Sequence, residues 1–325
     1  MSDFIVFLRM MNKLHLALLL SFSLLSLLPF ASAETFILPP SDTALIGQDR
    51  IVYARYEDTL MDIASKYSIG YDEILKVNPD VDRWLPGDGT PVVLPTRYIL
   101  PETPREGIVL NLPEMRMYYY PPVGPGGIPT VQTYPVGIGR MDWATPLGVT
   151  RIVAKVRNPT WTPPASIKRE HLEMYNEVLP NVVSAGPDNP LGLFAMRLGI
   201  PGYLIHGTNK KDGVGSRVSH GCVRMYNDDI AHLFPQVPEG SVVRIINQPV
   251  KVGRLAGALF IEAHAPFVDD YDPRFEPLPP NEATIQEASR VIEQKYGALF
   301  QNQIDWESVH QAIEQGNGRV IRISG

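Results

Sequence analysis

The sequence predicts a mainly β protein: a β-sandwich or barrel domain, a small βααβ module before it and a short α-helical extension after it. The 325 residues include 31 prolines, roughly twice the usual share of about 5%, and proline interrupts both helices and central strands. Many short apolar runs are bounded by glycine, proline or asparagine, as in sandwiches and barrels. The hydrophobic share of 44% excludes a mostly disordered chain.

The charge balance excludes one class of function. The formal net charge is −6, with 29 basic residues against 35 acidic ones. Proteins that bind nucleic acids usually carry a basic excess, so no nucleic-acid partner is expected. The length allows about two domains with a substantial core.

Residues 1–33 predict a secretory signal peptide. Two basic residues precede the apolar run 14–28, and an A-x-A cleavage site ends at Ala33. An uncleaved membrane anchor is the alternative, but the apolar core is short for a spanning helix. Met10 and Met11 are alternative starts. We expect an exported chain with no membrane segment after cleavage.

The small βααβ module is expected over residues 50–96. Its first helix begins at the capping pair Thr59 and Asp62, a shorter helix covers 72–77, and a strand over 91–94 closes the module. One apolar face of the first helix is formed by Leu60, Ile63, Ala64 and Tyr67.

This module resembles a LysM domain in several short segments. The match lies in Asp58-Thr59-Leu60, Asn78-Pro79, Trp84-Leu85-Pro86-Gly87 and Val92-Val93-Leu94-Pro95. Glu57 stands where that family usually has glycine. The resemblance implies a βααβ fold that binds N-acetylglucosamine-containing glycans such as peptidoglycan. The alternative is a helical hairpin that only packs on its neighbour.

A stiff, proline-containing linker is expected over 97–106, followed by a β-rich domain over 107–248. Two helices are expected inside that domain, over 169–178 and 228–234. Strands are expected over 107–112, 115–120, 130–138, 149–156, 193–198, 203–206 and 242–246.

The extension, 249–325, has no predicted role. An acidic, proline-rich loop is expected over 267–280, and a helix after it should end near Gly297. A second helix should end at Gly316, before a final strand over 319–323.

The chemistry is concentrated between residues 206 and 224, which include the sole cysteine, Cys222. An exported protein with one cysteine cannot form an internal disulfide, so this thiol is either buried and inert or kept for reactivity. A nucleophilic thiol needs a base, and His206 and His220 are both candidates. The backbone N–H groups at Gly221-Cys222 could face a developing oxyanion.

Two other interpretations of these residues are open. Cys222 could be a buried structural residue, although glycines and two histidines flank it. A zinc site of His206, His220 and Cys222 is chemically possible, but the paired-ligand spacing of known motifs is missing. We expect no metal or nucleotide cofactor.

His206 together with Ser219-His220-Gly221-Cys222 and Arg224 resembles the signature of the L,D-transpeptidase catalytic domain of the YkuD type. The resemblance extends over about 105–250. It includes Pro135-Val136-Gly137-Ile138-Gly139, Ala144-Thr145-Pro146-Leu147-Gly148, Trp161-Thr162-Pro163-Pro164 and Gly186-Pro187-Asp188-Asn189-Pro190-Leu191-Gly192. The LysM-like module before it matches the arrangement of the family's periplasmic subgroup.

The resemblance implies a cysteine acyl-transfer enzyme without a cofactor. Cys222 would be the nucleophile, His206 the general acid and base, and the backbone carbonyl of Gly207 would orient His206. Ser219, His220 and Gly221 would shape the pocket and the oxyanion site. The donor would be a peptidoglycan tetrapeptide stem, which loses its terminal D-Ala. The acceptor would be the diaminopimelate amine of another stem or a lysine of an outer-membrane lipoprotein. Carbapenems are expected to acylate the same cysteine.

Three further residues are candidates for substrate binding. Arg224 could hold a stem carboxylate, or it could form a structural salt bridge with Asp228 or Asp229. Arg217 has the same two interpretations, substrate binding or a structural salt bridge. Trp161, like Trp143, could line the groove or belong to the core.

Competing functions use the same residues differently. With water as acceptor, the same thioester would make the protein an L,D-carboxypeptidase or a hydrolase that releases lipoprotein. A non-catalytic wall-binding protein is the alternative of another class. The His206 and Cys222 pair argues against it.

Overall fold

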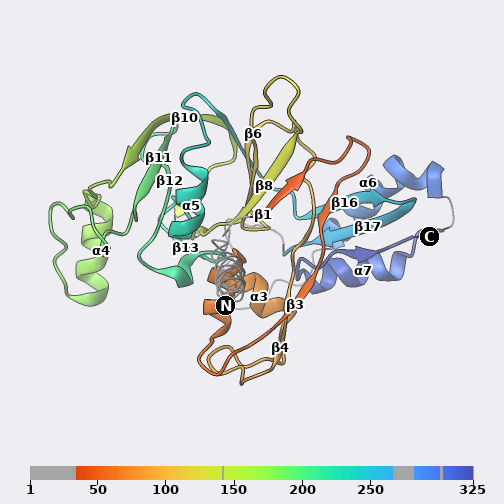
Figure 1. The fold of residues 1–325 in the computed structure, drawn as a ribbon, viewed down its shortest axis with the longest axis horizontal. Helices are drawn as coiled ribbons and strands as arrows, with labels where there is room; N and C mark the ends of the chain where they lie inside the picture. Colours follow the sequence, from red (N-terminus) through yellow and green to blue (C-terminus); the bar gives the residue numbers. More distant parts are fainter. Residues whose placement is uncertain (1–33, 141–142, 266–281, 301–302, 325) are drawn as a thin grey trace, which may run out of the picture. The chain divides into compact units, whose positions relative to one another are not determined.

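A computed structural model describes residues 34–140, 143–265, 282–300 and 303–324 (Figure 1). The predicted signal peptide and the whole acidic loop expected over 267–280 therefore lie outside the described residues. Within those ranges, none of the helices has the length and apolar character needed to cross a membrane.

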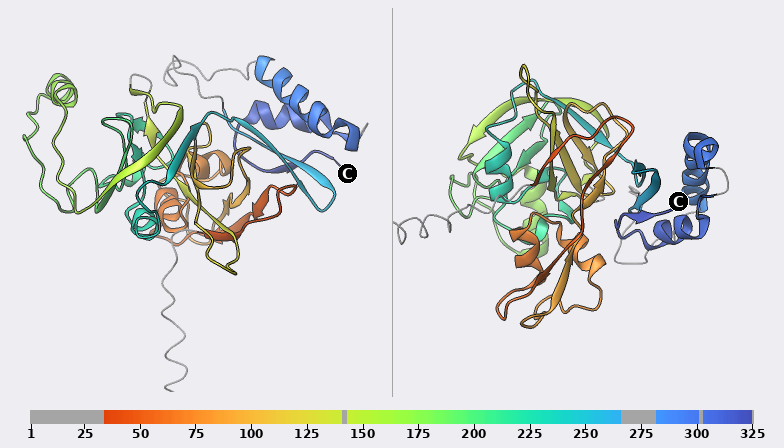
Figure 2. Two further views of the ribbon diagram at one scale, coloured as in Figure 1. Left: turned by 90° about the horizontal axis from the view of Figure 1, so that it is seen from above. Right: turned by 45° about the vertical axis from the view of Figure 1, so that its right-hand side comes forward.

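A large curled sheet of nine strands forms the centre of the fold and confirms the prediction of a mainly β protein (Figures 1 and 2). Its strand order is β1-β8-β7-β6-β15-β10-β11-β12-β14. Neighbours are antiparallel except for the parallel pairs β15–β6 and β12–β14. The strands are β1 (Glu34–Ile37), β6 (Gly107–Asn111), β7 (Arg116–Tyr120), β8 (Thr130–Pro135), β10 (Gly148–Arg157), β11 (Phe194–Leu198), β12 (Leu204–His206), β14 (Val223–Arg224) and β15 (Val242–Ile246).

Apolar side chains from one face of this sheet pack with α5 (Asn227–Leu233) into the main core. Ile205 of β12 and Val223 of β14 are both fully buried there. β9 (Ile138–Gly139) and β13 (Arg217–Ser219) form a separate two-stranded parallel sheet. In the chain, β9 follows β8, and β13 comes between β12 and β14. The other helix of this region, α4 (Ala165–Tyr175), begins earlier than the expected residue 169 and has Pro164 as its N-cap residue.

The N-terminal βααβ module has the expected order of elements. Strands β3 (Arg50–Tyr53) and β4 (Pro91–Leu94) pair antiparallel around α2 (Leu60–Lys66) and α3 (Tyr71–Val77). Thr59 and Asp62 form the expected capping box at the start of α2. The module has its own core, to which Leu60, Ile63, Ala64, Ile69, Ile74, Val92 and Leu94 contribute.

Backbone contacts join this module to the loop that leads to Cys222. The N–H groups of Tyr71 and Asp72, in the first turn of α3, donate to the carbonyls of Val214 and Gly215 at 3.0 and 3.3 Å. The Ser216 hydroxyl donates to the Asp72 carboxylate at 2.9 Å. The module therefore supports residues 214–216, which precede Cys222 in the chain.

Three short strands in the N-terminal part were not predicted: β1, β2 (Leu45–Gly47) and β5 (Arg97–Ile99). β1 adds to the large sheet beside β8, and β2 pairs with β5. The segment expected to be a linker therefore begins with a strand, and its prolines come only after that strand. A short strand is stabilised by its distant partner, which local composition does not reveal.

The C-terminal extension contains a sheet as well as the expected helices. β16 (Val250–Leu255), β17 (Ala258–Ala263) and β18 (Ile321–Arg322) pack against α6 (Glu282–Phe300) and α7 (Trp306–Gln315). The β16–β17 hairpin was missed, although its turn, Ala256-Gly257, has the two positive φ angles of a tight hairpin.

Gly297 does not end α6, which continues to Phe300. A helical glycine costs only about 1 kcal/mol, and the buried Phe300 ring offsets that cost. Gly316 caps α7 in the left-handed conformation at the expected position.

Candidate active site

Two neighbouring parallel strands carry His206 and Cys222. In the register of β12 with β14, Ile205 is paired with Val223 and His206 with Arg224. Because the first pair faces the core, side-chain alternation places His206, Arg224 and the residue before β14, Cys222, on the opposite face. The rise per residue and the strand spacing give about 8 Å between the Cα atoms of His206 and Cys222. The pairing thus places the thiol and this imidazole on one surface.

The His206 imidazole is buried and held in one orientation. Its Nδ1 lies 2.6 Å from the carbonyl oxygen of Gly207. A carbonyl only accepts, so Nδ1 carries the proton and Nε2 keeps a free lone pair. Burial, together with the nearby Arg224 cation, lowers the pKa of His206 to about 4. The imidazole is therefore neutral near pH 7 and can take up a proton through Nε2.

The Cys222 thiol is partly buried and lies 3.6 Å from the carbonyl oxygen of Gly202. Burial raises the pKa of the Cys222 thiol, and a backbone hydrogen bond from Leu204 and the charge of Arg224 only partly oppose this. The resting pair is consequently a neutral thiol and a neutral imidazole. Deprotonation of the thiol needs an acceptor at the moment of reaction.

The turn before Cys222 is fixed by close backbone packing. Gly221 has φ of 95°, and a Cβ atom at this position would lie 2.8 Å from the ring of Tyr203. The buried Thr145 hydroxyl donates to the Gly221 carbonyl at 2.9 Å. The Ser219 hydroxyl donates to the Cys222 carbonyl at 2.5 Å. Ser219 and Gly221 therefore shape the turn on which Cys222 is mounted.

His220 points to a group that the sequence analysis missed. Its Nε2 lies 2.9 Å from Oε2 of Glu170, on α4, and the other Glu170 oxygen accepts from Nη2 of Arg140 at 2.6 Å. The Trp143 ring stands edge-on to the His220 ring at 5.4 Å between centroids. Burial raises the pKa of the Glu170 carboxyl, but the bonds from Arg140 and His220 outweigh it and lower the value. No local pattern marks Glu170, because its partners are distant in sequence.

Arg224 acts electrostatically on both candidate reacting groups. Its charge acts on His206 and Cys222, and burial lowers the pKa of Arg224 itself, with Cys222 and Asp212 opposing the shift. Arg217 is held by β13 beside Ile138, and Trp161 pairs through its backbone with Val183. These contacts do not connect either side chain with the thiol.

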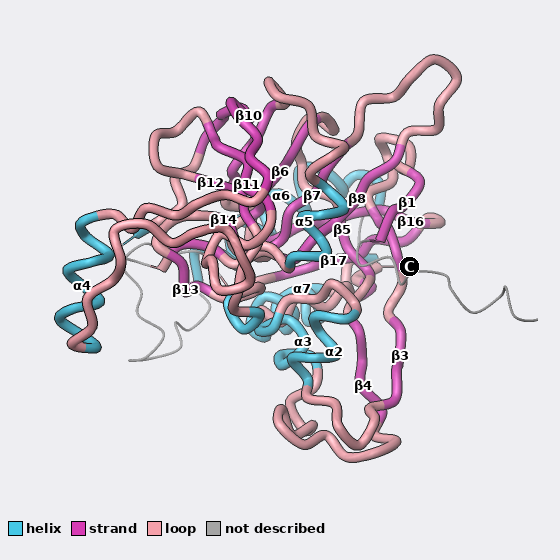
Figure 3. Tube along the Cα trace, turned by 60° about the vertical axis from the view of Figure 1, so that its left-hand side comes forward, coloured by secondary structure: helices cyan, strands magenta, loops and turns pink. Residues whose placement is uncertain are grey.

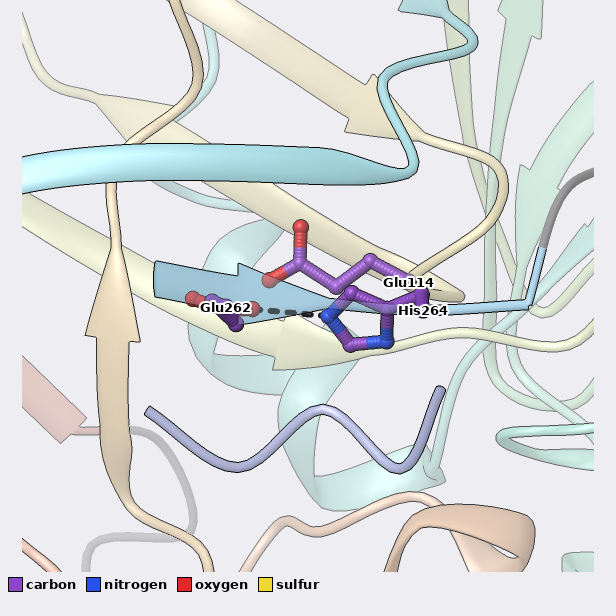
Figure 4. A group of neighbouring side chains, drawn as sticks. All are labelled: Glu114, Glu262 and His264. Atoms are coloured by element: carbon purple, nitrogen blue, oxygen red, sulfur yellow. Dashed lines mark hydrogen bonds and ion pairs between the residues drawn. The ribbon is translucent and has the colours of Figure 1, made fainter. Parts of the chain in front are cut away.

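Among the described residues, one group has its possible ligand atoms close enough together to hold a metal ion: Glu114, Glu262 and His264 (Figure 4). This group does not include Cys222 or either histidine of the candidate active site. The zinc set of His206, His220 and Cys222 considered above is therefore not assembled. In the buried cluster, Nζ of Lys251 lies 2.8 Å from both Glu114 and Glu262. This ammonium already occupies the position of a cation between the two carboxylates, so the cluster is a buried ion-pair network between the β-rich domain and the extension.

Comparison with known proteins identifies the family. Residues 105–245 match the family model described as the L,D-transpeptidase catalytic domain, YkuD. "Probable L,D-transpeptidase YcfS" of Escherichia coli is 44% identical over 261 residues, which cover 78% of this chain and 80% of the relative. "Probable L,D-transpeptidase YbiS" of the same organism is 37% identical over 316 residues, or 96% of this chain and 99% of the relative. With this identity over nearly the whole chain, the protein belongs to the L,D-transpeptidases, a family of transferase enzymes.

Proposed function

We propose that this protein is a periplasmic, cysteine-dependent L,D-transpeptidase that acts on peptidoglycan stem peptides. The observation that carries the proposal is the pairing of β12 with β14, which puts a neutral, oriented imidazole and the sole thiol on one face. Membership in the family supports the reaction type. The expected signal peptide and the relatives from Escherichia coli support the compartment.

In the first step, the Cys222 sulfur attacks the carbonyl carbon of the third stem residue. Nε2 of His206 takes the thiol proton and passes it to the nitrogen of the departing D-Ala as the peptide bond breaks. In the second step, an acceptor amine attacks the thioester, and His206 takes its proton and returns it to the sulfur. One amide bond replaces another, so no cofactor is needed.

The electrostatics favour proton transfer during attack over a preformed thiolate and imidazolium pair. The pKa of His206 is lowered to about 4 and that of Cys222 is raised, so the ion pair is disfavoured in the free enzyme. When the thiol is deprotonated, the Arg224 cation stabilises the negative charge on sulfur. Burial first and the Arg224 charge second therefore keep His206 neutral before the reaction, and the same charge supports the thiolate during it.

The N-terminal module would bind the glycan strand as a LysM domain. Its order of elements and capping box are those expected, and it exposes aromatic side chains that can stack on sugars. Tyr53 and Trp84 are 70% and 63% exposed. This module would keep the enzyme on the wall while the second domain reacts.

The test is mass spectrometry of residues 34–325 incubated with disaccharide-tetrapeptide, with Cys222→Ala as control. A cross-linked dimer that has lost one D-Ala supports the proposal. A lipoprotein offered as second acceptor would instead become joined to the tripeptide stem. Free tripeptide alone would identify a hydrolase, and no reaction with either acceptor would favour a wall-binding protein.

A further inference from the structure

One carboxylate is held between two residues of the candidate active site. The Glu170 side chain shares its oxygens between Arg140, at 2.6 Å, and His220, at 2.9 Å. Arg140 directly follows β9, and His220 lies between β13 and β14, whereas Glu170 comes from α4. The two donors thus form a site for a carboxylate group, with Glu170 as its present occupant.

This site adjoins the nucleophile. His220 is two residues from Cys222, and the Arg140 backbone N–H donates to the Ser219 carbonyl at 2.9 Å. A Cβ atom on Gly139, the residue before Arg140, would lie 2.9 Å from Cα of Gly221. A carboxylate bound here would therefore belong to a peptide whose scissile bond lies at the thiol.

The site has unused donor capacity. Nε of Arg140 is buried and finds no hydrogen-bond partner among the residues that the structure describes. Glu170 engages only Nη2 of that guanidinium, because its second oxygen is directed to His220. A guanidinium prefers to bind a carboxylate through two parallel N–H groups, so a differently placed carboxylate would satisfy Nε as well.

Glu170 lies on α4, a helix that makes few packing contacts with the rest of the fold. None of the α4 residues is buried, and the helix has no side-chain cap at its start. Leu172, Met174 and Tyr175 are each about half exposed or more, at 47%, 62% and 61%. In Figures 1 and 3, α4 lies at the edge of the fold beyond β13. Moving Glu170 away would therefore break little packing.

We propose that Arg140 and His220 are the receptor for a carboxylate of the donor stem and that Glu170 occupies it until the stem binds. The exchange replaces one carboxylate by another, so the charge of the site is preserved. The proposal rests on the proposed function, because it takes the tetrapeptide stem as substrate. The stem offers two sources of this group: the terminal D-Ala carboxylate and the side-chain carboxylate of its third residue.

The experiment compares three donor peptides: the unmodified stem, the stem with its terminal carboxylate amidated, and the stem with its side-chain carboxylate amidated. The wild type should prefer the unmodified stem in kcat/KM over one amide by roughly 10- to 100-fold, the factor typical of hydrogen bonds to a charged group. Which amide is disfavoured identifies the bound carboxylate. Arg140→Ala should remove this preference, and Arg140→Lys should keep part of it.

Glu170→Gln removes the competing charge while keeping the side-chain shape. It should lower KM for the unmodified stem several-fold at unchanged kcat. Glu173→Gln, at an exposed position of the same helix, is the matched control and should change neither constant. An increase of KM in Glu170→Gln, or equal use of all three donors by the wild type, would overturn the proposal.

Binding measurements separate this proposal from the proposed function. Calorimetry with Cys222→Ala compares the three donors without turnover. If the wild type converts none of them but the unmodified stem binds most tightly, the receptor stands and the transpeptidase proposal fails. Equal binding of all three donors would refute the receptor whatever the turnover.

Discussion

The lowered pKa of His206 predicts an unusual pH dependence of the reaction. With a pKa of about 4, about 90% of the imidazole is neutral at pH 5, whereas at the ordinary value of about 6.5 only about 3% would be neutral. The wild type should therefore retain roughly thirty times more activity at pH 5 than an enzyme with an unperturbed histidine base. The measurement is kcat/KM for disaccharide-tetrapeptide from pH 4 to 8, which reports ionisations of the free enzyme and the free substrate.

Arg224→Gln is the perturbation that tests the cause. Burial and the Arg224 charge both lower the pKa of His206, so loss of the charge should raise it and move the acidic limb of the profile to higher pH. The same change should slow alkylation of Cys222 near neutral pH, because Arg224 also favours the thiolate. Conversely, a wild-type limb near pH 6.5, or no movement in Arg224→Gln, would refute the electrostatic reasoning.

The remaining predictions concern the nucleophile and the stability of the fold. Cys222→Ala should abolish product formation while binding to sedimented peptidoglycan stays unchanged; remaining turnover would exclude this nucleophile. Between pH 6.5 and 4 the unfolded chain binds more protons at His206 than the folded protein does. The free energy of unfolding should therefore decrease as the pH is lowered, by up to about 3 kcal/mol from this residue. Urea unfolding of His206→Gln should lack that part of the slope. Lys251→Met, which leaves two carboxylates buried, should cost about 3–5 kcal/mol in the same assay, against little change for the exposed Lys76→Met.

Local pattern predicted most elements of the β-rich domain. The strand expected over 107–112 is β6, and the one expected over 242–246 is β15, because both are apolar runs closed by turn residues. The β16–β17 hairpin was missed even though its two strands flank a two-residue turn. The pairs β1–β8 and β2–β5 could not be predicted, because short strands are defined by partners far away in sequence.

The sequence by itself determined the chemical inventory: one thiol, two nearby histidines and the glycines of a tight turn around Cys222. These residue types point to acyl transfer in any compatible fold. Only the tertiary structure decided that His206 shares the face of Cys222 while His220 turns to Glu170, since strand register and helix placement arise from long-range packing. It also decided the protonation states, because the burial and charges that shift a pKa exist only once the chain is folded.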